Sequence, residues 1–285
     1  MTFVIRFAPS PTGPLHLGHA YSAMLAHDMA RAENGDFLLR IEDIDKSRAR
    51  THWENQIYDD LRWLGVTWDG PVIRQSENTA AYSHALDILW DKGLLYQCDC
   101  KRRDILDAAQ APQEDAPTHG PDGLIYPGTC RHAHPRTGSR PETVALRLDL
   151  SAAIAQIGAT LTYSETGENA GQIEISNPMQ TIGDIVLARR DMGTSYHLSV
   201  VVDDAAQGVT HIIRGADLAG ATGIHVILQH LLDLPTPIYH HHHLIRDEAG
   251  KRLAKRDDAR AISKYRAEGA TPNDIRQMVG LPPAP

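Results

Sequence analysis

The chain has 285 residues, of which 42% are hydrophobic and 22% are charged, and its formal net charge at pH 7 is −8. This balance is typical of a soluble globular protein with one large domain and an insertion, or with two domains. No apolar run approaches the roughly 20 residues of a membrane span, and the amino terminus lacks a signal-peptide pattern. We therefore expect a cytoplasmic protein with no membrane partner. The negative charge argues against holding nucleic acid by bulk attraction.

Strands and helices alternate along the chain. A short apolar strand at 3–7 precedes a helix that includes 20–26, and a buried strand, Asp36–Ile41, ends in the acidic run Glu42-Asp43-Ile44-Asp45. Apolar residues then recur at helical spacing, and further strands or buried elements follow, in the order 53–64, 80–92, 143–149, 184–188, 198–202 and 210–214. Two short helices at most are expected in 261–280. The alternation predicts an α/β fold with a mostly parallel sheet.

Several polar stretches stand apart from this pattern. An internal run of four histidines, 240–243, most simply exposes alternate imidazoles on a strand, and a metal cluster is the lesser alternative. Two basic stretches, Lys101-Arg102-Arg103 and 246–266, are candidate contacts for RNA. A solvated surface is the alternative for both.

The junction between the first strand and the first helix carries the most specific signal. It reads Arg6-Phe-Ala-Pro-Ser-Pro-Thr-Gly-Pro-Leu-His-Leu-Gly-His19, with prolines and glycines that predict a tight connection. Such a junction lets backbone approach a nucleotide, points helix N-terminal N–H groups at phosphate, and here adds two imidazoles. A helix cap or a buried polar contact is the alternative role for each histidine.

A second signal is the basic, glycine-preceded stretch Lys251-Arg252-Leu253-Ala254-Lys255-Arg256. Alone it is an ordinary polar loop, although such a loop can supply mobile positive charge to a phosphate chain. Together, the two segments resemble the ATP-binding signatures of class I aminoacyl-tRNA synthetases, glutamyl branch. In that comparison Arg252 and Lys255 occupy the two lysine positions of the Lys-Met-Ser-Lys-Ser loop, and Ala254 replaces its serine.

The resemblance implies a Rossmann-type catalytic domain that activates an amino acid with Mg-ATP. A carboxylate oxygen attacks the α-phosphate and pyrophosphate leaves, so the protein contributes positioning and fixed positive charge. It implies catalytic roles for His16, His19 and Lys255. It places ATP against Pro9, His16, Gly18, His19, Arg252 and Lys255.

The same resemblance proposes a pocket for L-glutamate. Its contacts fall at Arg6, Ala8, Ser10, Glu42, Tyr196 and Arg214. A guanidinium offers donors only, so Arg214 suits a carboxylate and would leave the amide of glutamine facing unpaired N–H groups, at about 1–3 kcal/mol. Glu42 suits the substrate ammonium. The alternative is that Glu42 and Arg214 pair with neighbouring charges as structural residues.

All three cysteines lie within one proline-containing segment, as Cys98, Cys100 and Cys130. In a reducing compartment this spacing favours one structural zinc over disulfides, and zinc takes four ligands. General chemistry favours a histidine as the fourth ligand, His119, His132 or His134, because a phenol has a pKa of about 10. The resemblance instead implies Tyr126, with His132 in reserve. Three incidental buried thiols are the alternative.

The length of the chain distinguishes between related members of this glutamyl branch. Only 29 residues follow Arg256, too few for an anticodon-binding domain. We expect a catalytic domain over 1–96 and 142–245, a zinc-binding insertion over 97–141, and the loop with a short helical segment over 246–285. This architecture resembles the glutamyl-Q-tRNA(Asp) synthetases. The resemblance implies a monomer that activates glutamate without tRNA and transfers it to the cyclopentenediol of queuosine in tRNA(Asp).

Two other functions remain open from the sequence. One is a truncated or partner-dependent glutamyl-tRNA synthetase. The other is an inactive, zinc-stabilised RNA-binding paralogue. The histidines at 16 and 19, Glu42, Arg214 and Lys255 argue against the second, because a pure binding protein needs no ATP site.

Overall fold

A seven-stranded sheet forms the centre of the molecule in the computed structural model, which describes residues 2–109, 119–245 and 260–283. The strand order is β3-β2-β1-β11-β12-β8-β9, with parallel neighbours except for the outermost pair, β8 and β9. The predicted α/β fold with a mostly parallel sheet is confirmed. The strands are β1 (Val4–Phe7), β2 (Asp36–Ile41), β3 (Ile73–Arg74), β8 (Thr162–Glu165), β9 (Gly171–Glu174), β11 (His211–Gly215) and β12 (Ile238–His242).

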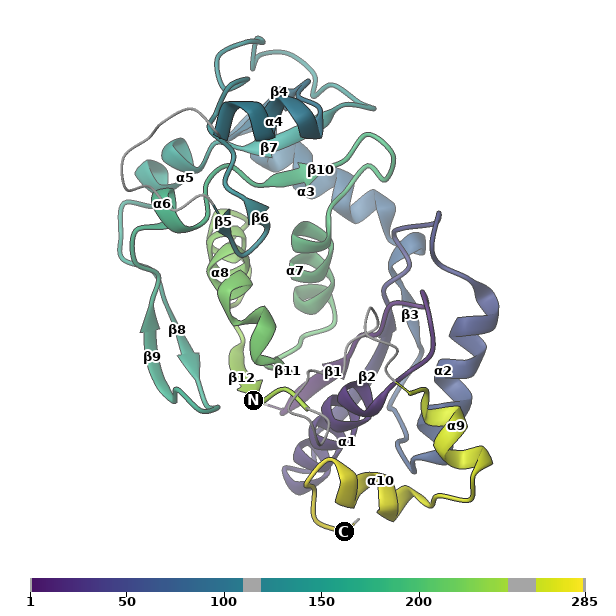
Figure 1. Cartoon of the computed structure of the whole chain (residues 1–285). Helices are drawn as coiled ribbons and strands as arrows, with labels where there is room; N and C mark the ends of the chain where they lie inside the picture. The colour runs from purple at the N-terminus through teal and green to yellow at the C-terminus, as the bar shows by residue number, and fades with distance from the viewer. Residues whose placement is uncertain (1, 110–118, 246–259, 284–285) are drawn as a thin grey trace.

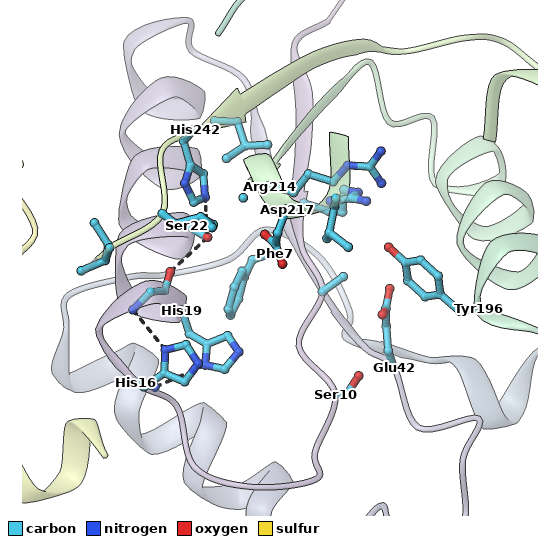
Figure 2. Close-up of a pocket in the computed structure, with 18 residues that line it drawn as sticks. Phe7, Ser10, His16, His19, Ser22, Glu42, Tyr196, Arg214, Asp217 and His242 are labelled. Carbon is cyan, nitrogen blue, oxygen red and sulfur yellow. Dashed lines mark hydrogen bonds between the residues drawn. The ribbon is translucent and has the colours of Figure 1, made fainter. Parts of the chain in front are cut away.

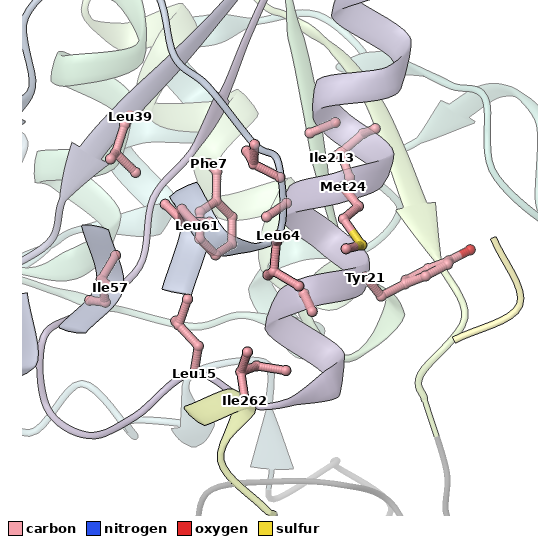
Figure 3. Close-up of a cluster of buried hydrophobic side chains, with 14 of the residues drawn as sticks. Phe7, Leu15, Tyr21, Met24, Leu39, Ile57, Leu61, Leu64, Ile213 and Ile262 are labelled. Carbon is pink, nitrogen blue, oxygen red and sulfur yellow. The ribbon is translucent and has the colours of Figure 1, made fainter. Parts of the chain in front are cut away.

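Helix α1 (Leu17–Ala32) packs against β1, β2 and β11. Its buried face carries small side chains, so the helix backbone comes close to the sheet. Together with α2 (Thr51–Trp63) it encloses an apolar cluster, shown in Figure 3, that includes Phe7, Met24, Leu39 and Leu61. The helical pattern at 53–64 is confirmed by α2, and that at 80–92 by α3 (Thr79–Asp91).

A second sheet, which we did not predict, lies apart from the first, at the top of the view in Figure 1. It is antiparallel, in the order β10-β7-β4, with β4 (Leu95–Cys98), β7 (Ala145–Leu148) and β10 (Val186–Ala188). Around it lie α4 (Arg102–Ala109), β5 (His119–Gly120), β6 (Gly123–Leu124), α5 (Leu150–Ile157) and α6 (Pro178–Thr181). The strands of this sheet are distant in sequence, so no local pattern indicates their pairing.

Two buried segments differ from the simplest expectation. Residues 198–202 belong to helix α7 (Tyr196–Ala206), not to a strand, because the helix is enclosed on several sides and shows no polar stripe. The histidine run lies on β12 as expected, but His241 and His242 are both buried rather than alternating. Helix α8 (Thr222–Leu231) follows β11 through the 3-10 turn η2 (Ala216–Ala221), and a similar turn, η1 (Gln75–Glu77), precedes α3.

The carboxyl-terminal part contains two short helices, as predicted, α9 (Ile262–Ala267) and α10 (Pro272–Met278). Ile262 is fully buried in the cluster under α1, and its N–H donates to the Leu15 carbonyl at 2.9 Å. The division into catalytic domain, insertion and carboxyl-terminal segment stays a prediction. Within the described residues, no helix is both long and apolar enough to cross a membrane.

Candidate active site

A cavity of about 460 Å³ opens at the carboxyl ends of β1, β2, β11 and β12. The chain leaves β1 for β2 on one side, whereas β11 pairs with β1 on the other, so the cavity lies where the strand order reverses. Open parallel sheets bind ligands at such a point. The sheet topology alone therefore places a ligand site here.

The cavity gathers most of the predicted site residues (Figure 2). The histidine rings lie on one side, and Arg214, Glu42 and Tyr196 lie on the other. Its lining includes Arg6, Ala8, Ser10, His16, Gly18, His19, Glu42, Tyr196 and Arg214. Pro9 is buried and does not line the cavity; its carbonyl accepts the Glu42 N–H at 3.1 Å and so links the two strand ends. Arg252 and Lys255 lie outside the described residues.

His16 and His19 also cap helix α1. The His16 Nδ1 accepts the Gly18 N–H at 3.1 Å, and the His19 Nδ1 accepts the His16 N–H at 3.3 Å. Because both Nδ1 atoms accept, each neutral ring carries its proton on Nε2. The rings stack with centroids 3.8 Å apart. The capping role and a donor role toward phosphate are therefore compatible.

Arg6 and Glu42 belong to a buried ionic network. Arg6 donates to both carboxylate oxygens of Asp204, at 2.9 and 3.2 Å. Arg40 donates to Asp204 at 2.7 Å and to Glu42 at 3.4 Å. Burial alone would raise the pKa of Asp204, but the charges of Arg40 and Arg6 bring it below its usual value. Asp204 therefore remains ionised and holds both guanidinium groups in place.

Glu42 and Tyr196 face the same part of the cavity (Figure 2). Burial raises the pKa of Glu42, and Arg40 and Arg6 only partly offset this. Burial also raises the pKa of Tyr196, with a contribution from the Glu42 carboxylate, so the phenol keeps its proton at neutral pH. Glu42 offers a carboxylate acceptor with a raised pKa, which suits an ammonium group. Tyr196 offers a hydroxyl, which suits the carboxylate next to that ammonium.

Arg214, by contrast, is held by neutral groups. Its Nε donates to His241 Nε2 at 3.1 Å, Nη1 to His225 Nδ1 at 3.1 Å and Nη2 to Thr222 Oγ1 at 2.7 Å. Among the described residues its guanidinium makes no ion pair. The sequence left open that Glu42 and Arg214 pair with neighbouring charges as structural residues. Glu42 does make such a contact, with Arg40, whereas Arg214 makes none within the described residues.

The structure adds residues that sequence reasoning missed. Ser22, Asp217 and His242 line the cavity, and Asp204 accepts a hydrogen bond from Arg6 in the cavity wall. His242 Nε2 lies 2.7 Å from Ser22 Oγ. The position of His242 at the carboxyl end of β12 was a usable signal, because parallel strands end at one edge. Asp204 could not be identified from the sequence, because it lies in the last turn of α7 and 198 residues from Arg6.

The described residues that flank the basic loop both lie at this site. Ile245 lines the cavity on the amino-terminal side of the gap. Ala261, on the other side, forms an isolated antiparallel bridge with His16. Ile245 and Ala261 therefore both lie at the cavity, Ala261 directly beside His16.

The three cysteines form a separate cluster. Their Sγ atoms all lie within 4.8 Å of one another, with Cys100 and Cys130 at 3.4 Å. Sulfurs around a tetrahedral zinc at 2.3 Å would lie about 3.8 Å apart. Burial raises the pKa of Cys100 to about 11; that of Cys130 falls to about 7, against the effect of burial, through hydrogen bonds such as that with Tyr126. The group can hold a metal ion.

Tyr126 lies among these sulfurs, and the candidate histidines do not. Its Oη is 3.2 Å from Cys100 Sγ and 3.5 Å from Cys98 Sγ, and it accepts the Cys130 N–H at 2.9 Å. His134 instead contacts Asp99 at 2.5 Å, and His119 and His132 are exposed. Within the described chain, no histidine joins the cluster. Arg147 lies over the phenol ring and donates to Cys98 Sγ at 3.3 Å.

Comparison with known proteins defines the class of the chain. Residues 2–282 match the family of class I tRNA synthetases (E and Q), catalytic domain. The chain belongs to this family, and it is an enzyme whose expected nucleotide substrate is ATP.

Individual relatives narrow the comparison. The chain is 63% identical over 282 residues to a glutamyl-Q tRNA(Asp) synthetase of Rhodobacter capsulatus, covering 98% of this chain and 100% of that protein. It is 41% identical over 290 residues to the protein of the same name from Nocardia farcinica, covering 98% and 86%.

Among solved structures, a glutamate tRNA ligase from Elizabethkingia meningosepticum in complex with its amino acid is similar with a TM-score of 0.76 and 26% identity. That similarity covers 98% of this chain and 60% of the ligase. The chain thus spans about 60% of the length of the solved ligase that it matches.

Proposed function

We propose that the enzyme activates L-glutamate with Mg-ATP in the absence of tRNA and then transfers glutamate to the cyclopentenediol of queuosine in the anticodon of tRNA(Asp). The glutamate assignment rests on the presence of Arg214 and Glu42 in the lining of one cavity. Arg214 supplies a cation that is held by neutral acceptors, and Glu42 supplies a carboxylate. The 63% identity to a glutamyl-Q tRNA(Asp) synthetase over nearly the whole chain supports the transfer step.

The cavity fits a bound glutamate at one end. The side-chain carboxylate pairs with Arg214, because a guanidinium that makes no ion pair within the described residues still offers its donors to an anion. The ammonium pairs with Glu42, and the Tyr196 hydroxyl and Ser10 add polar contacts, with Arg6 and Ala8 completing the wall. Glutamine would leave its amide N–H groups facing guanidinium donors, which disfavours it.

ATP lies at the other end, with the phosphates against the start of α1. The Nε2–H groups of His16 and His19 donate to phosphate oxygens, because the Nδ1 atoms of both rings already accept. Backbone N–H groups in the first turn of α1, around Gly18, add further donors. Pro9 shapes this segment, and Lys255 and Arg252 supply charge for the leaving pyrophosphate. The glutamate α-carboxylate attacks the α-phosphate, the bond to the β-phosphate breaks, and magnesium arrives with the nucleotide.

In the second step a diol hydroxyl attacks the carbonyl of the mixed anhydride. The C–O bond to AMP breaks, AMP leaves with the electron pair, the hydroxyl proton is released, and an ester remains. The protein contributes position, not a nucleophile.

We further propose that Cys98, Cys100, Tyr126 and Cys130 hold one structural zinc ion. Four protein donors leave no open coordination position, so the ion stabilises the cysteine segment and takes no part in the reaction. Metal analysis is expected to return about one zinc per chain. Cys100→Ser is expected to lose it, and a metal-free protein with unchanged melting temperature would contradict the assignment.

The decisive test of the function uses two assays on the full chain. Pyrophosphate exchange into ATP should need glutamate but no tRNA, and should be far slower with glutamine or aspartate. Labelled glutamate should then charge tRNA(Asp) that contains queuosine, and not tRNA(Asp) that lacks it. Charging of the acceptor end of tRNA(Glu) would instead identify a glutamyl-tRNA synthetase, and no exchange with any amino acid would identify an inactive relative.

A further inference from the structure

Arg214 is the end point of two chains of polar contacts, each of which begins at a carboxylate. One runs from Glu165 through His241, whose Nδ1 lies 2.5 Å from Glu165 Oε2. The other runs from Asp122 through His197 and His225. Neither chain was indicated by the sequence, and the function proposed above uses only the last contact of each, the one with Arg214.

The longer chain joins three elements. His197 Nε2 on α7 lies 3.2 Å from Asp122 Oδ1, and His197 Nδ1 lies 3.1 Å from His225 Nε2 on α8. His225 Nδ1 then faces Arg214 Nη1 at 3.1 Å. Asp122 lies in the turn between β5 and β6, the hairpin that packs beside α7 and α8 in Figure 1. This hairpin belongs to the cysteine-containing segment.

The proton positions along this chain are dictated by its two ends. A guanidinium only donates, so His225 Nδ1 must accept and its proton must be on Nε2. That proton points at His197 Nδ1, which must accept in turn, so His197 carries its proton on Nε2. Asp122 Oδ1 lies 3.2 Å from His197 Nε2, an ion-pair contact at the far end of the chain. The two hydrogen bonds from Arg214 to His225 and from His225 to His197 therefore run in one direction, towards this carboxylate.

The shorter chain obeys the same logic. Glu165 accepts the His241 backbone N–H at 2.9 Å and faces its Nδ1, so the ring proton lies on Nδ1 and Nε2 accepts from Arg214. Burial lowers the pKa of His241 despite its contact with Glu165. Burial and the charge of Arg214 lower the pKa of His225 well below its usual value. Both rings therefore stay neutral beside the guanidinium.

We propose that Asp122, through His197 and His225, is a positioning residue that fixes the tautomers of the imidazoles behind Arg214 and thereby aims its guanidinium at the substrate carboxylate. The inference rests on the proposed glutamate site. Its consequence is that a hairpin of the cysteine segment, outside the cavity, sets the affinity for the amino acid.

Losing the acceptor at position 122 has a defined effect. Arg214 alone then favours the tautomers with the proton on Nε2, so the tautomers of His197 and His225 with the proton on Nδ1 rise in population. In that state a His225 N–H faces an Arg214 N–H, so the guanidinium must turn away from its bonded position. The Asp122 side chain is about half exposed (47%), so its replacement disturbs little packing.

The kinetic test compares Asp122→Leu with Asp122→Asn, because the asparagine oxygen still accepts the His197 proton. In pyrophosphate exchange we expect Asp122→Leu to raise the KM for glutamate about five- to tenfold, with the KM for ATP and the melting temperature unchanged. Asp122→Asn should restore the wild-type KM. Asp59→Leu, an exposed change of the same charge on α2, serves as the matched control.

An increase in both KM values with a lower melting temperature, or no change in the glutamate KM, would overturn the inference. His225→Asn extends the test, because its amide oxygen still accepts from Arg214 but no longer reaches His197. We expect Asp122→Leu to have no additional effect on the glutamate KM in that background, and additive effects would contradict a single chain.

A measurement without activity separates this inference from the proposed function. Nitrogen-15 NMR of the wild-type imidazoles should show the proton on Nε2 in His197 and His225 and on Nδ1 in His241, with His197 and His225 changed in Asp122→Leu. Any of the three rings in the opposite tautomer in the wild type would refute the chain. If the tautomers are as stated but glutamate supports no exchange, then only the proposed function fails.

Discussion

The two arginines of the cavity have opposite surroundings. Arg6 makes two hydrogen bonds to the Asp204 carboxylate, which also holds Arg40. Arg214 rests against two neutral imidazoles and a threonine hydroxyl. Both side chains are buried, at 5% and 6% exposed. Within the described residues the charge of Arg6 is paired with a carboxylate and the charge of Arg214 is not. The same residue type therefore supports the cavity wall in one place and, in the function proposed above, binds the substrate carboxylate in the other.

The largest effect is expected from Arg214→Leu. Removing one partner of a buried charge pair costs about 2–5 kcal/mol, or about 30- to 5,000-fold in kcat/KM for glutamate. Steady-state pyrophosphate exchange measures this loss. Equal losses with glutamate and glutamine would remove the discriminating role of Arg214.

Arg6→Leu tests the other half of the comparison. It leaves Asp204 with one cation fewer in a buried site, which costs about 3–5 kcal/mol of folding free energy. We expect the melting temperature to fall by roughly 10 °C, at about 2–4 °C per kcal/mol for a chain of this size. Thermal unfolding followed by circular dichroism provides the measurement. A stable variant with only a raised glutamate KM would assign Arg6 to substrate alone.

The pH dependence of glutamate binding sharpens the assignment of Glu42. Only the ionised carboxylate pairs with an ammonium, and burial raises its pKa above the usual value. Glutamate KM should therefore be constant at high pH and rise as the pH falls through this raised pKa, by about tenfold per unit at the limit. Glu42→Gln should remove this acidic limb at the cost of a high KM throughout. The same acidic limb in Glu42→Gln would assign the titration elsewhere.

Thr222→Val should give the smallest effect. It preserves shape and removes only the oxygen that accepts from Arg214 Nη2 at 2.7 Å. A buried donor left without a partner costs about 1–3 kcal/mol, part of which a bound carboxylate recovers. We expect the glutamate KM to rise about fivefold while the KM for ATP stays constant. A larger effect than that of Arg214→Leu is incompatible with the neutral-acceptor description.

Most of the predicted residues that line the cavity lie at a strand end or in a contiguous signature, whereas Tyr196 lies at the start of α7. Ser10 and His19 share one string, and Glu42 directly follows the end of β2. Parallel strands bring such positions to one edge without further information. The close approach of Tyr126 to the cysteines is likewise compatible with short spacing.

The support behind the cavity could not be predicted. Asp204 reaches Arg6 across 198 positions. Arg214 is held by His225 on α8 and, through His241, by Glu165 on β8. The antiparallel sheet of β4, β7 and β10 depends on equally remote pairing. Buried polar partners are chosen by three-dimensional neighbours, and a single sequence records no such pairs.

The anchoring of Ile262 has a practical consequence for anyone who shortens this protein. Its side chain fills the cluster below α1, and its amide holds the segment that carries His16. Cutting the chain before α9 removes Ile262, Ile275 and Val279 from this cluster, each worth roughly 1.5–3 kcal/mol, together with the hydrogen bond to the segment that carries His16. The last two helices thus stabilise the first motif, and a trimmed variant is expected to lose both folding stability and affinity for the nucleotide that we propose binds there.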